Sequence, residues 1–154
     1  MTDSKRLITK NITLGDAAVD GLCSGVIAGV VMVAYLVMVE LVAGPGPELV
    51  LGRFDPNEAT SPLTGRLMHL AVASVYGALF GLIGWLTARV RPFGRLPAWL
   101  AGLAYGLTLL LLAKAVILPG VASPLLEIST VHFTLAHVIY GLTLGFLFNR
   151  TKNR

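Results

Sequence analysis

Four apolar stretches, each long enough to cross a bilayer, occupy most of this chain of 154 residues. They cover about residues 20–43, 67–88, 98–118 and 130–148. Each is close to the roughly 20 residues that a helix needs to span about 30 Å of hydrocarbon. Hydrophobic residues make up 55% of the chain and charged residues 13%, a balance that is atypical of soluble domains. The sequence therefore predicts a single all-α membrane domain, a bundle of four transmembrane helices.

Basic residues gather before the first stretch, between the second and third, and after the fourth. The other two connections hold only Arg53 and Arg66. Cytoplasmic loops of membrane proteins carry an excess of lysine and arginine. We therefore expect both termini on the cytoplasmic side of a bacterial inner membrane, with lipids and no nucleic acid as partners of the basic residues. These residues are Lys5, Arg6, Lys10, Arg89, Arg91, Arg95, Arg150, Lys152 and Arg154.

Proline and glycine mark the ends of the stretches. Gly44 and its following prolines end the first, and Ser61-Pro62 suits the cap and first position of the second helix. Pro119-Gly120 follows the third stretch, and Ser123-Pro124 is a suitable start for the fourth helix. Residues 45–62 form the only sizeable external connection, which we expect to be an ordered or partly ordered loop.

Tyrosine-glycine pairs suggest that a helical hairpin is duplicated. Residues 75–77 with Gly81 match residues 139–141 with Gly145, so both read aliphatic-Tyr-Gly-x-x-x-Gly. Glycines spaced four apart share one helix face and allow two backbones to approach closely. We predict that such faces pack helices, either within the bundle or between subunits. The glycines are Gly21, Gly25, Gly29, Gly77, Gly81, Gly102, Gly106, Gly141 and Gly145.

Each predicted helix carries one tyrosine near the centre of the bilayer, counted at about 1.5 Å per residue. A buried phenol needs a hydrogen-bond partner, so we expect hydrogen bonds between helices at Tyr35, Tyr76, Tyr105 and Tyr140. The single cysteine, Cys23, excludes a disulfide within the chain. It is expected to be buried and inert, packing as a small apolar group.

Five ionisable side chains lie within the outer half of the predicted bilayer. Such groups are costly in hydrocarbon and usually face a bundle interior or a wet cavity. Their shared depth allows them to pair, most obviously Glu40 with Lys114. These candidates for binding a ligand, an ion or a cofactor are Glu40, His69, Lys114, His132 and His137.

These residues are compatible with several roles. The charged groups can reach the interface while the histidines hydrogen-bond inside the bundle, or the group can line a pathway for protons, ions or polar solutes. The pair of His69 with either His132 or His137 is compatible with haem b ligation. Two histidines together with Glu40 are compatible with a metal site. No pattern specifies a metal or a cofactor, so none is predicted. No paired nucleophile and base is found either, so no catalytic residue and no enzyme activity is predicted.

Short motifs spread over all four stretches carry a family resemblance. They are residues 136–145, His69, Tyr76-Gly77, Gly25, Gly29 and residues 118–120. In these motifs the chain resembles small uncharacterised bacterial inner-membrane proteins of the YagU-like kind. This resemblance implies a four-helix inner-membrane protein without an established activity.

The leading functional hypothesis is a non-enzymatic membrane subunit. It would pack through its glycine faces into a homo-oligomer or a larger assembly, such as a respiratory or photosynthetic complex. A second hypothesis is a small transporter or channel whose outward-facing vestibule is lined by the five ionisable side chains. A third is a haem-binding electron-transfer protein of the membrane.

Overall fold

A computed structural model describes residues 12–44, 46–55, 61–88, 96–121 and 123–152. Within them, four helices are long and apolar enough to cross a membrane. The predicted all-α fold with four spans is therefore confirmed, and the chain is a multi-pass membrane protein. The elements are α1 (Leu14–Ala43), α2 (Pro47–Gly52), α3 (Pro62–Thr87), α4 (Ala98–Leu112), the π-helical turn η2 (Ala113–Ile117), α5 (Leu118–Gly120), the 3₁₀ turn η3 (Pro124–Glu127) and α6 (Thr130–Lys152).

Short-range hydrogen bonds fix the ends of the first two long helices. The Thr13 hydroxyl accepts the backbone N–H of Asp16, and the Asp16 carboxylate accepts that of Thr13, which is a capping box. α1 therefore begins before residue 20, where the apolar stretch begins. It ends at Gly44, whose φ of 112° suits glycine. α3 begins as predicted, with Ser61 as its cap and Pro62 in its first turn.

The third and fourth spans differ from the expected plain helices. Pro119 has no N–H to donate to the carbonyl four residues earlier, and the helix widens into η2 just before it. Ser123-Pro124 was expected to start the fourth helix but instead starts η3. Ile128 then turns to extended backbone with its side chain 2% exposed, so the fourth membrane helix starts only at Thr130.

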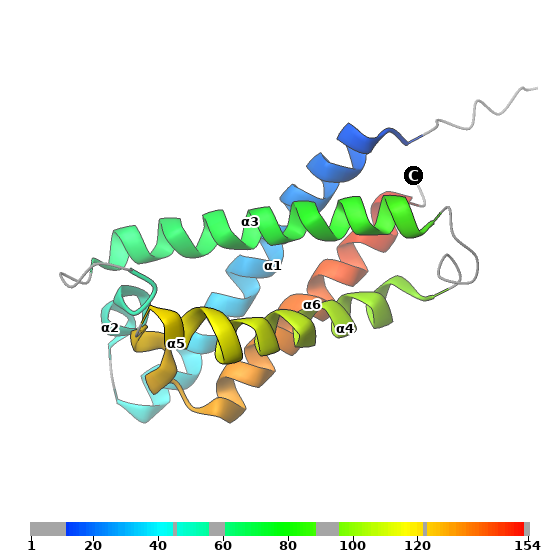
Figure 1. The fold of residues 1–154 in the computed structure, drawn as a ribbon. Helices are drawn as coiled ribbons and strands as arrows, with labels where there is room; N and C mark the ends of the chain where they lie inside the picture. The colour runs from blue at the N-terminus through cyan, green and yellow to red at the C-terminus, as the bar shows by residue number, and fades with distance from the viewer. Residues whose placement is uncertain (1–11, 45, 56–60, 89–95, 122, 153–154) are drawn as a thin grey trace, which may run out of the picture.

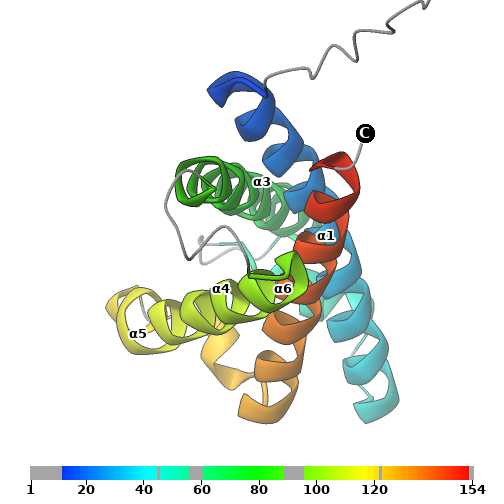
Figure 2. The same ribbon diagram turned by 90° about the vertical axis from the view of Figure 1, so that its right-hand side faces the viewer.

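The four long helices form two crossed layers. In Figures 1 and 2, α3 and α4 lie beside each other while α1 and α6 cross them on one side. α1 packs along α3, α4 along α6, and α1 along α6. The short segments α2, α5 and η3 gather at one end of the bundle, called here the α2 end, whereas the C-terminal end of α6 lies at the other (Figure 1).

Each hairpin is held by the same close contact between backbones. A Cβ atom added to Gly25 on α1 would lie 2.7 Å from Gly77 Cα on α3. In the second hairpin, a Cβ on Gly106 would lie 3.0 Å from Gly141 Cα. Only glycine allows helices to come this close, so dispersion contacts between backbones can hold each pair together in a solvent as apolar as leucine.

The contact pattern repeats position by position in the two hairpins. In the first, Ala17, Gly21 and Gly25 face Ala73, Gly77 and Gly81; in the second, Ala98, Gly102 and Gly106 face His137, Gly141 and Gly145. Gly29 in turn faces the Ala73 Cβ and the His69 ring. The glycines that the sequence singled out therefore lie in contacts within the chain.

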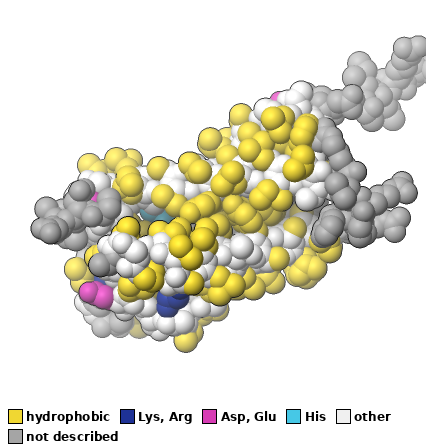
Figure 3. Space-filling view, in the orientation of Figure 1, with side chains coloured by type: hydrophobic (Ala, Val, Ile, Leu, Met, Phe, Trp, Pro, Cys, Tyr) yellow, Lys and Arg dark blue, Asp and Glu magenta, His cyan; other side chains and the backbone are white. Residues whose placement is uncertain are grey.

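Large apolar side chains cover the outer faces of the long helices (Figure 3), as expected for a surface solvated by lipid. Cys23 is exposed on such a face, so the prediction of a buried thiol is wrong. The reason is helical geometry: at about 100° per residue, Cys23 points away from Gly21 and Gly25, the residues that α1 presents to α3.

The basic residues behind the orientation prediction lie at positions whose side chains the structure does not describe. Asn57 and Glu58 of the external connection also fall outside the described residues. The described part of that connection is residues 46–55, which hold α2 and the three residues that follow it, together with Ser61 and Pro62.

Candidate functional site

A cavity of about 350 Å³ lies between the two layers of helices near the α2 end. Residues of all four long helices and of the segments at the α2 end line it, and most of the lining is apolar. Some lining residues are also exposed on the outer surface: Met68 and Val72 on α3, Ile117 on η2, and Val121. The cavity therefore has a mouth on the outer surface, between α3 and the end of the third span.

Figure 3 shows this mouth as a hollow between α3 and α4, with histidine surface visible inside it. α3 and α4 are not among the closely packed pairs of helices, and long side chains bridge the space between them. The Tyr105 hydroxyl donates to the Tyr76 carbonyl at 2.8 Å, and the Phe80 and Tyr105 rings are 5.2 Å apart. These bridges hold α3 and α4 at a fixed distance.

His69 and His137 are the ionisable candidates that line the cavity. They are 9% and 8% exposed, respectively. His69 Nε2 donates to the Gly29 carbonyl at 3.0 Å, and His137 Nδ1 donates to the Phe133 carbonyl at 2.9 Å. Because a carbonyl oxygen only accepts, these two bonds fix the ring nitrogen that carries the hydrogen in each neutral histidine.

Glycine at position 29 allows the His69 ring to reach its hydrogen-bond partner, the Gly29 carbonyl. A Cβ atom on Gly29 would lie 2.6 Å from the Ala73 Cβ and 3.6 Å from His69 Nε2. A larger residue would push α1 away from α3 and break the bond to the Gly29 carbonyl. The small residues that close the first hairpin therefore also position this histidine.

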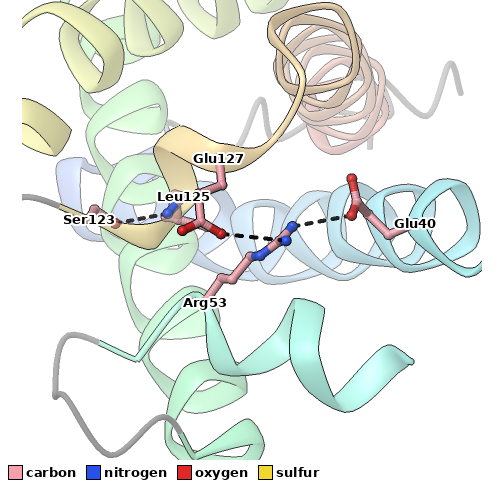
Figure 4. Close-up of polar contacts among 5 residues, drawn as sticks. All are labelled: Glu40, Arg53, Ser123, Leu125 and Glu127. Atoms are coloured by element: carbon pink, nitrogen blue, oxygen red, sulfur yellow. Dashed lines mark hydrogen bonds and ion pairs between the residues drawn. The ribbon is translucent and has the colours of Figure 1, made fainter. Parts of the chain in front are cut away.

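Glu40 pairs with Arg53 rather than with Lys114, so the predicted pairing is wrong. The Arg53 guanidinium lies 3.2 Å from the Glu40 carboxylate and 3.7 Å from that of Glu127. Figure 4 shows Arg53 between these two acidic side chains, which come from α1 and η3. The side chains of Arg53 and Glu40 are 15% and 13% exposed, and that of Glu127 is 69% exposed. This triad ties the segment after α2 to two other elements.

Lys114 and His132 lie outside the cavity lining and make separate contacts. The Lys114 ammonium donates to the Thr130 hydroxyl at 2.7 Å and lies 5.6 Å from the centre of the Phe133 ring. His132 Nδ1 is hydrogen-bonded to the Tyr35 hydroxyl, 3.1 Å away. The five ionisable candidates are thus divided among four places, and only His69 and His137 share one.

In three of the four long helices, the tyrosine hydroxyl forms a hydrogen bond to another helix, as the sequence predicted. The Tyr35 and Tyr105 hydroxyls bond across helices as given above, and the Tyr140 hydroxyl donates to the Ala73 carbonyl at 2.8 Å. Tyr76 takes part through its backbone carbonyl. The Tyr140 bond joins α6 to α3 beside the cavity, which Tyr140 also lines.

The sequence interpretation missed the residues that follow α2. Arg53, Phe54 and Asp55 all line the cavity, and the Phe54 ring lies 4.6 Å from that of His69. The segment docks because Gly65 gives it room: a Cβ there would lie 3.2 Å from the Asp55 nitrogen. The usable signal was the apolar pair Val50 and Phe54, spaced four apart in a segment treated as external loop.

The Asp55 carboxylate helps to hold this segment, because it accepts the backbone N–H of Ser61 at 2.9 Å. Among the described residues, no three His, Cys, Asp or Glu side chains are gathered so that they could hold a metal ion. Apolar walls with a few placed polar groups are typical of small-molecule binding sites. The geometry therefore points to binding by His69, His137 and the apolar lining.

Comparisons with known proteins give one match. Searches of curated proteins and of solved structures found no match, and the resemblance to YagU-like proteins stays a prediction. A family model, described as a family of unknown function (DUF6789), matches residues 16–154. This match covers the four membrane helices except for the first two residues of α1. The chain therefore belongs to the DUF6789 family.

Proposed function

We propose that the protein is a non-enzymatic membrane protein that binds a membrane-dissolved amphiphile in the cavity between α3 and α4. One observation carries this proposal: the cavity has a mouth on the apolar outer surface and two buried histidines in its wall. A molecule dissolved in the bilayer can enter through this mouth without crossing water. The protein would then bind, store or present such a molecule.

The size of the cavity fits the polar end and first carbons of such a molecule. Ligand pockets have volumes of about 300–1,000 Å³, and this one lies near the lower limit. The exposed side chains of Met68 and Val72 at the mouth would contact the rest of the hydrocarbon chain, which continues into the lipid. An amphiphile therefore fits better than a wholly enclosed apolar solute.

The distribution of basic residues supports an orientation with the α2 end outside. In that orientation the cavity lies in the outer half of the bilayer, and the triad of Glu40, Arg53 and Glu127 lies near the external interface. The ligand would come from the outer leaflet, with its polar end beneath the segment that follows α2.

Of the five ionisable candidates, only His69 and His137 would contact the ligand. Helices of the same chain fill the glycine faces, so association through them is not part of the proposal. The vestibule and haem hypotheses both relied on His69 and His137. These two residues keep their importance here, with hydrogen bonding as their role.

Photoaffinity labelling in proteoliposomes tests the proposal. The probes are two C16 chains carrying a diazirine, one ending in a hydroxyl and the other in a methyl ether. We expect at least one probe to label cavity-lining residues such as Leu109 and Ile117. Val72→Trp should abolish this labelling because the indole fills the mouth, and Val75→Trp should preserve it, because Val75 is exposed on the same helix but does not line the cavity. Labelling spread evenly over the outer faces and unchanged in Val72→Trp would contradict the proposal.

A further inference from the structure

We infer that the ligand of this cavity is a neutral amphiphile with a hydroxyl group at its polar end, which donates its one hydrogen bond to His69 or to His137. The inference rests on the proposed function and names its ligand class. It follows from the hydrogen bonds that the two imidazoles already make, from the atoms that remain free, and from the charges near the cavity.

The backbone uses the only N–H of each neutral ring. Within the described residues, neither ring forms an ion pair with a carboxylate, and burying an unpaired charge is costly, so both rings are neutral. His69 donates from Nε2 to Gly29, and His137 donates from Nδ1 to Phe133. The nitrogens left over, His69 Nδ1 and His137 Nε2, have a lone pair and no hydrogen. Both can therefore only accept.

These two nitrogens are open to the cavity. Among the described residues, no fully buried side-chain nitrogen or oxygen atom lacks a hydrogen-bond partner. Within this part of the chain, His69 Nδ1 and His137 Nε2 have no hydrogen-bond partner, so each must contact open space. Both residues line the cavity and are otherwise buried. The open space is therefore the cavity, and a ligand there meets two acceptors that need a donor.

The charges around the cavity argue against an anionic ligand. Arg53 is the one cation among the described residues that line it, and this guanidinium already lies next to the carboxylates of Glu40 and Glu127. A fatty acid carboxylate or a lipid phosphate would find no uncompensated positive charge here. It would also repel the lone pairs of the two imidazoles.

A hydroxyl group is the simplest neutral group that can donate to one of these acceptors. The Tyr140 hydroxyl already donates its hydrogen bond to the Ala73 carbonyl. The Tyr76 side chain also lines the cavity. Tyr76 can donate equally to a hydroxyl, an ether or an ester oxygen, so it does not select among them. The imidazoles do select, because an ether or an ester has no hydrogen to donate. Long-chain alcohols, isoprenoid alcohols, quinols and diacylglycerols belong to the selected class.

Competition against the diazirine alcohol tests this selection. The competitors are hexadecanol, its methyl ether and hexadecanoic acid, which share one hydrocarbon chain. We expect hexadecanol to displace the probe at a concentration roughly tenfold lower than the ether, a difference of about 1.4 kcal/mol, since the one hydrogen bond that the hydroxyl donates separates them. The acid, assayed at a pH high enough to ionise it in the bilayer, should compete no better than the ether.

Histidine variants assign this preference to the imidazoles. In the double variant His69→Phe/His137→Phe, the ratio between alcohol and ether should fall toward one whatever happens to the affinity itself, because the hydroxyl can donate to either imidazole. His132→Phe is the control, because His132 bonds to Tyr35 and does not line the cavity, and it should keep the ratio of the parent. An unchanged ratio in the double variant would overturn the role of the two histidines.

The remaining outcomes separate the inference from the proposed function. If the alcohol and the ether compete equally in the parent, or if the acid competes best, the hydroxyl class is wrong although a ligand still binds. If neither probe labels the cavity, the proposed function itself fails. The ratio in the parent needs no variant, so a double variant that does not fold leaves the test intact.

Discussion

Gly77→Leu is expected to destabilise the protein by roughly 3 kcal/mol or more, because overpacking of a rigid contact costs that much when backbone has to move. A Cβ at this position would lie 2.5 Å from Gly25 Cα and 2.8 Å from the Gly25 nitrogen. Neither atom can rotate away, so α1 and α3 have to separate. Thermal unfolding in mild detergent, followed by circular dichroism, measures the effect.

Two further variants make the result specific. Gly15→Leu introduces the same side chain into α1 where only the Thr13 hydroxyl lies near, at 3.8 Å, and it should unfold close to the parent temperature. Gly141→Leu should behave like Gly77→Leu, because Gly141 approaches Gly106 in the second hairpin as Gly77 approaches Gly25 in the first. A Gly77→Leu protein as stable as Gly15→Leu would show that the close packing of α1 and α3 is not essential.

Arg53→Gln is expected to destabilise the protein by about 2 kcal/mol. Breaking a buried ion pair typically costs about 3–5 kcal/mol, and the partial exposure of Arg53 and Glu40 lowers this cost through solvent screening. The substitution leaves the Glu40 carboxylate without its cation in a largely apolar surrounding. The free energy of unfolding in the same detergent measures the loss.

Arg66→Gln provides the control for Arg53→Gln. Arg66 is exposed, and its described hydrogen bond is to the nearby Pro62 carbonyl at 3.4 Å, so removing its charge should change stability by no more than about 0.5 kcal/mol. Adding Glu40→Gln to Arg53→Gln should recover part of the loss, because the one carboxylate then left without its cation, that of Glu127, is 69% exposed. Equal stabilities of Arg53→Gln and Arg66→Gln would mean that the triad is not a structural contact.

The four spans could be predicted because hydrocarbon imposes one length and one composition on any helix that crosses it. Their ends were less predictable, since they depend on individual hydrogen bonds. The capping box at Thr13 and Asp16 starts α1 early, and Pro119 converts the end of the third span into a π turn. The glycine pattern showed which faces come close but did not show which helices they join.

The depth of the candidate residues in the membrane could be predicted from the sequence, but the direction in which each side chain points could not. His132 and His137 lie on one helix, five residues apart, which turns them about 140° from each other at about 100° per residue. One contacts Tyr35 and the other lines the cavity. Which of the two would face the cavity depends on where α1 and α3 pack, and short motifs do not give this.

Arg53 shows a different limit of sequence analysis. The basic side chain lies in a connection that is polar and rich in proline, and such segments usually run over the surface. It returns to the bundle only because Gly65 accepts the chain closely and Val50 is fully buried. The spacing of Val50 and Phe54 signals an apolar face on this segment, but it does not show against which part of the bundle that face packs.

Native mass spectrometry of the purified protein tests the cavity most directly. After extraction into mild detergent, the parent and Val75→Trp should each carry one neutral lipid with a free hydroxyl group, released intact on activation. Val72→Trp should be detected without a bound lipid, because the indole occupies the mouth between α3 and α4. A parent that carries no lipid, or a lipid that Val72→Trp retains as well as Val75→Trp does, would contradict binding in this cavity.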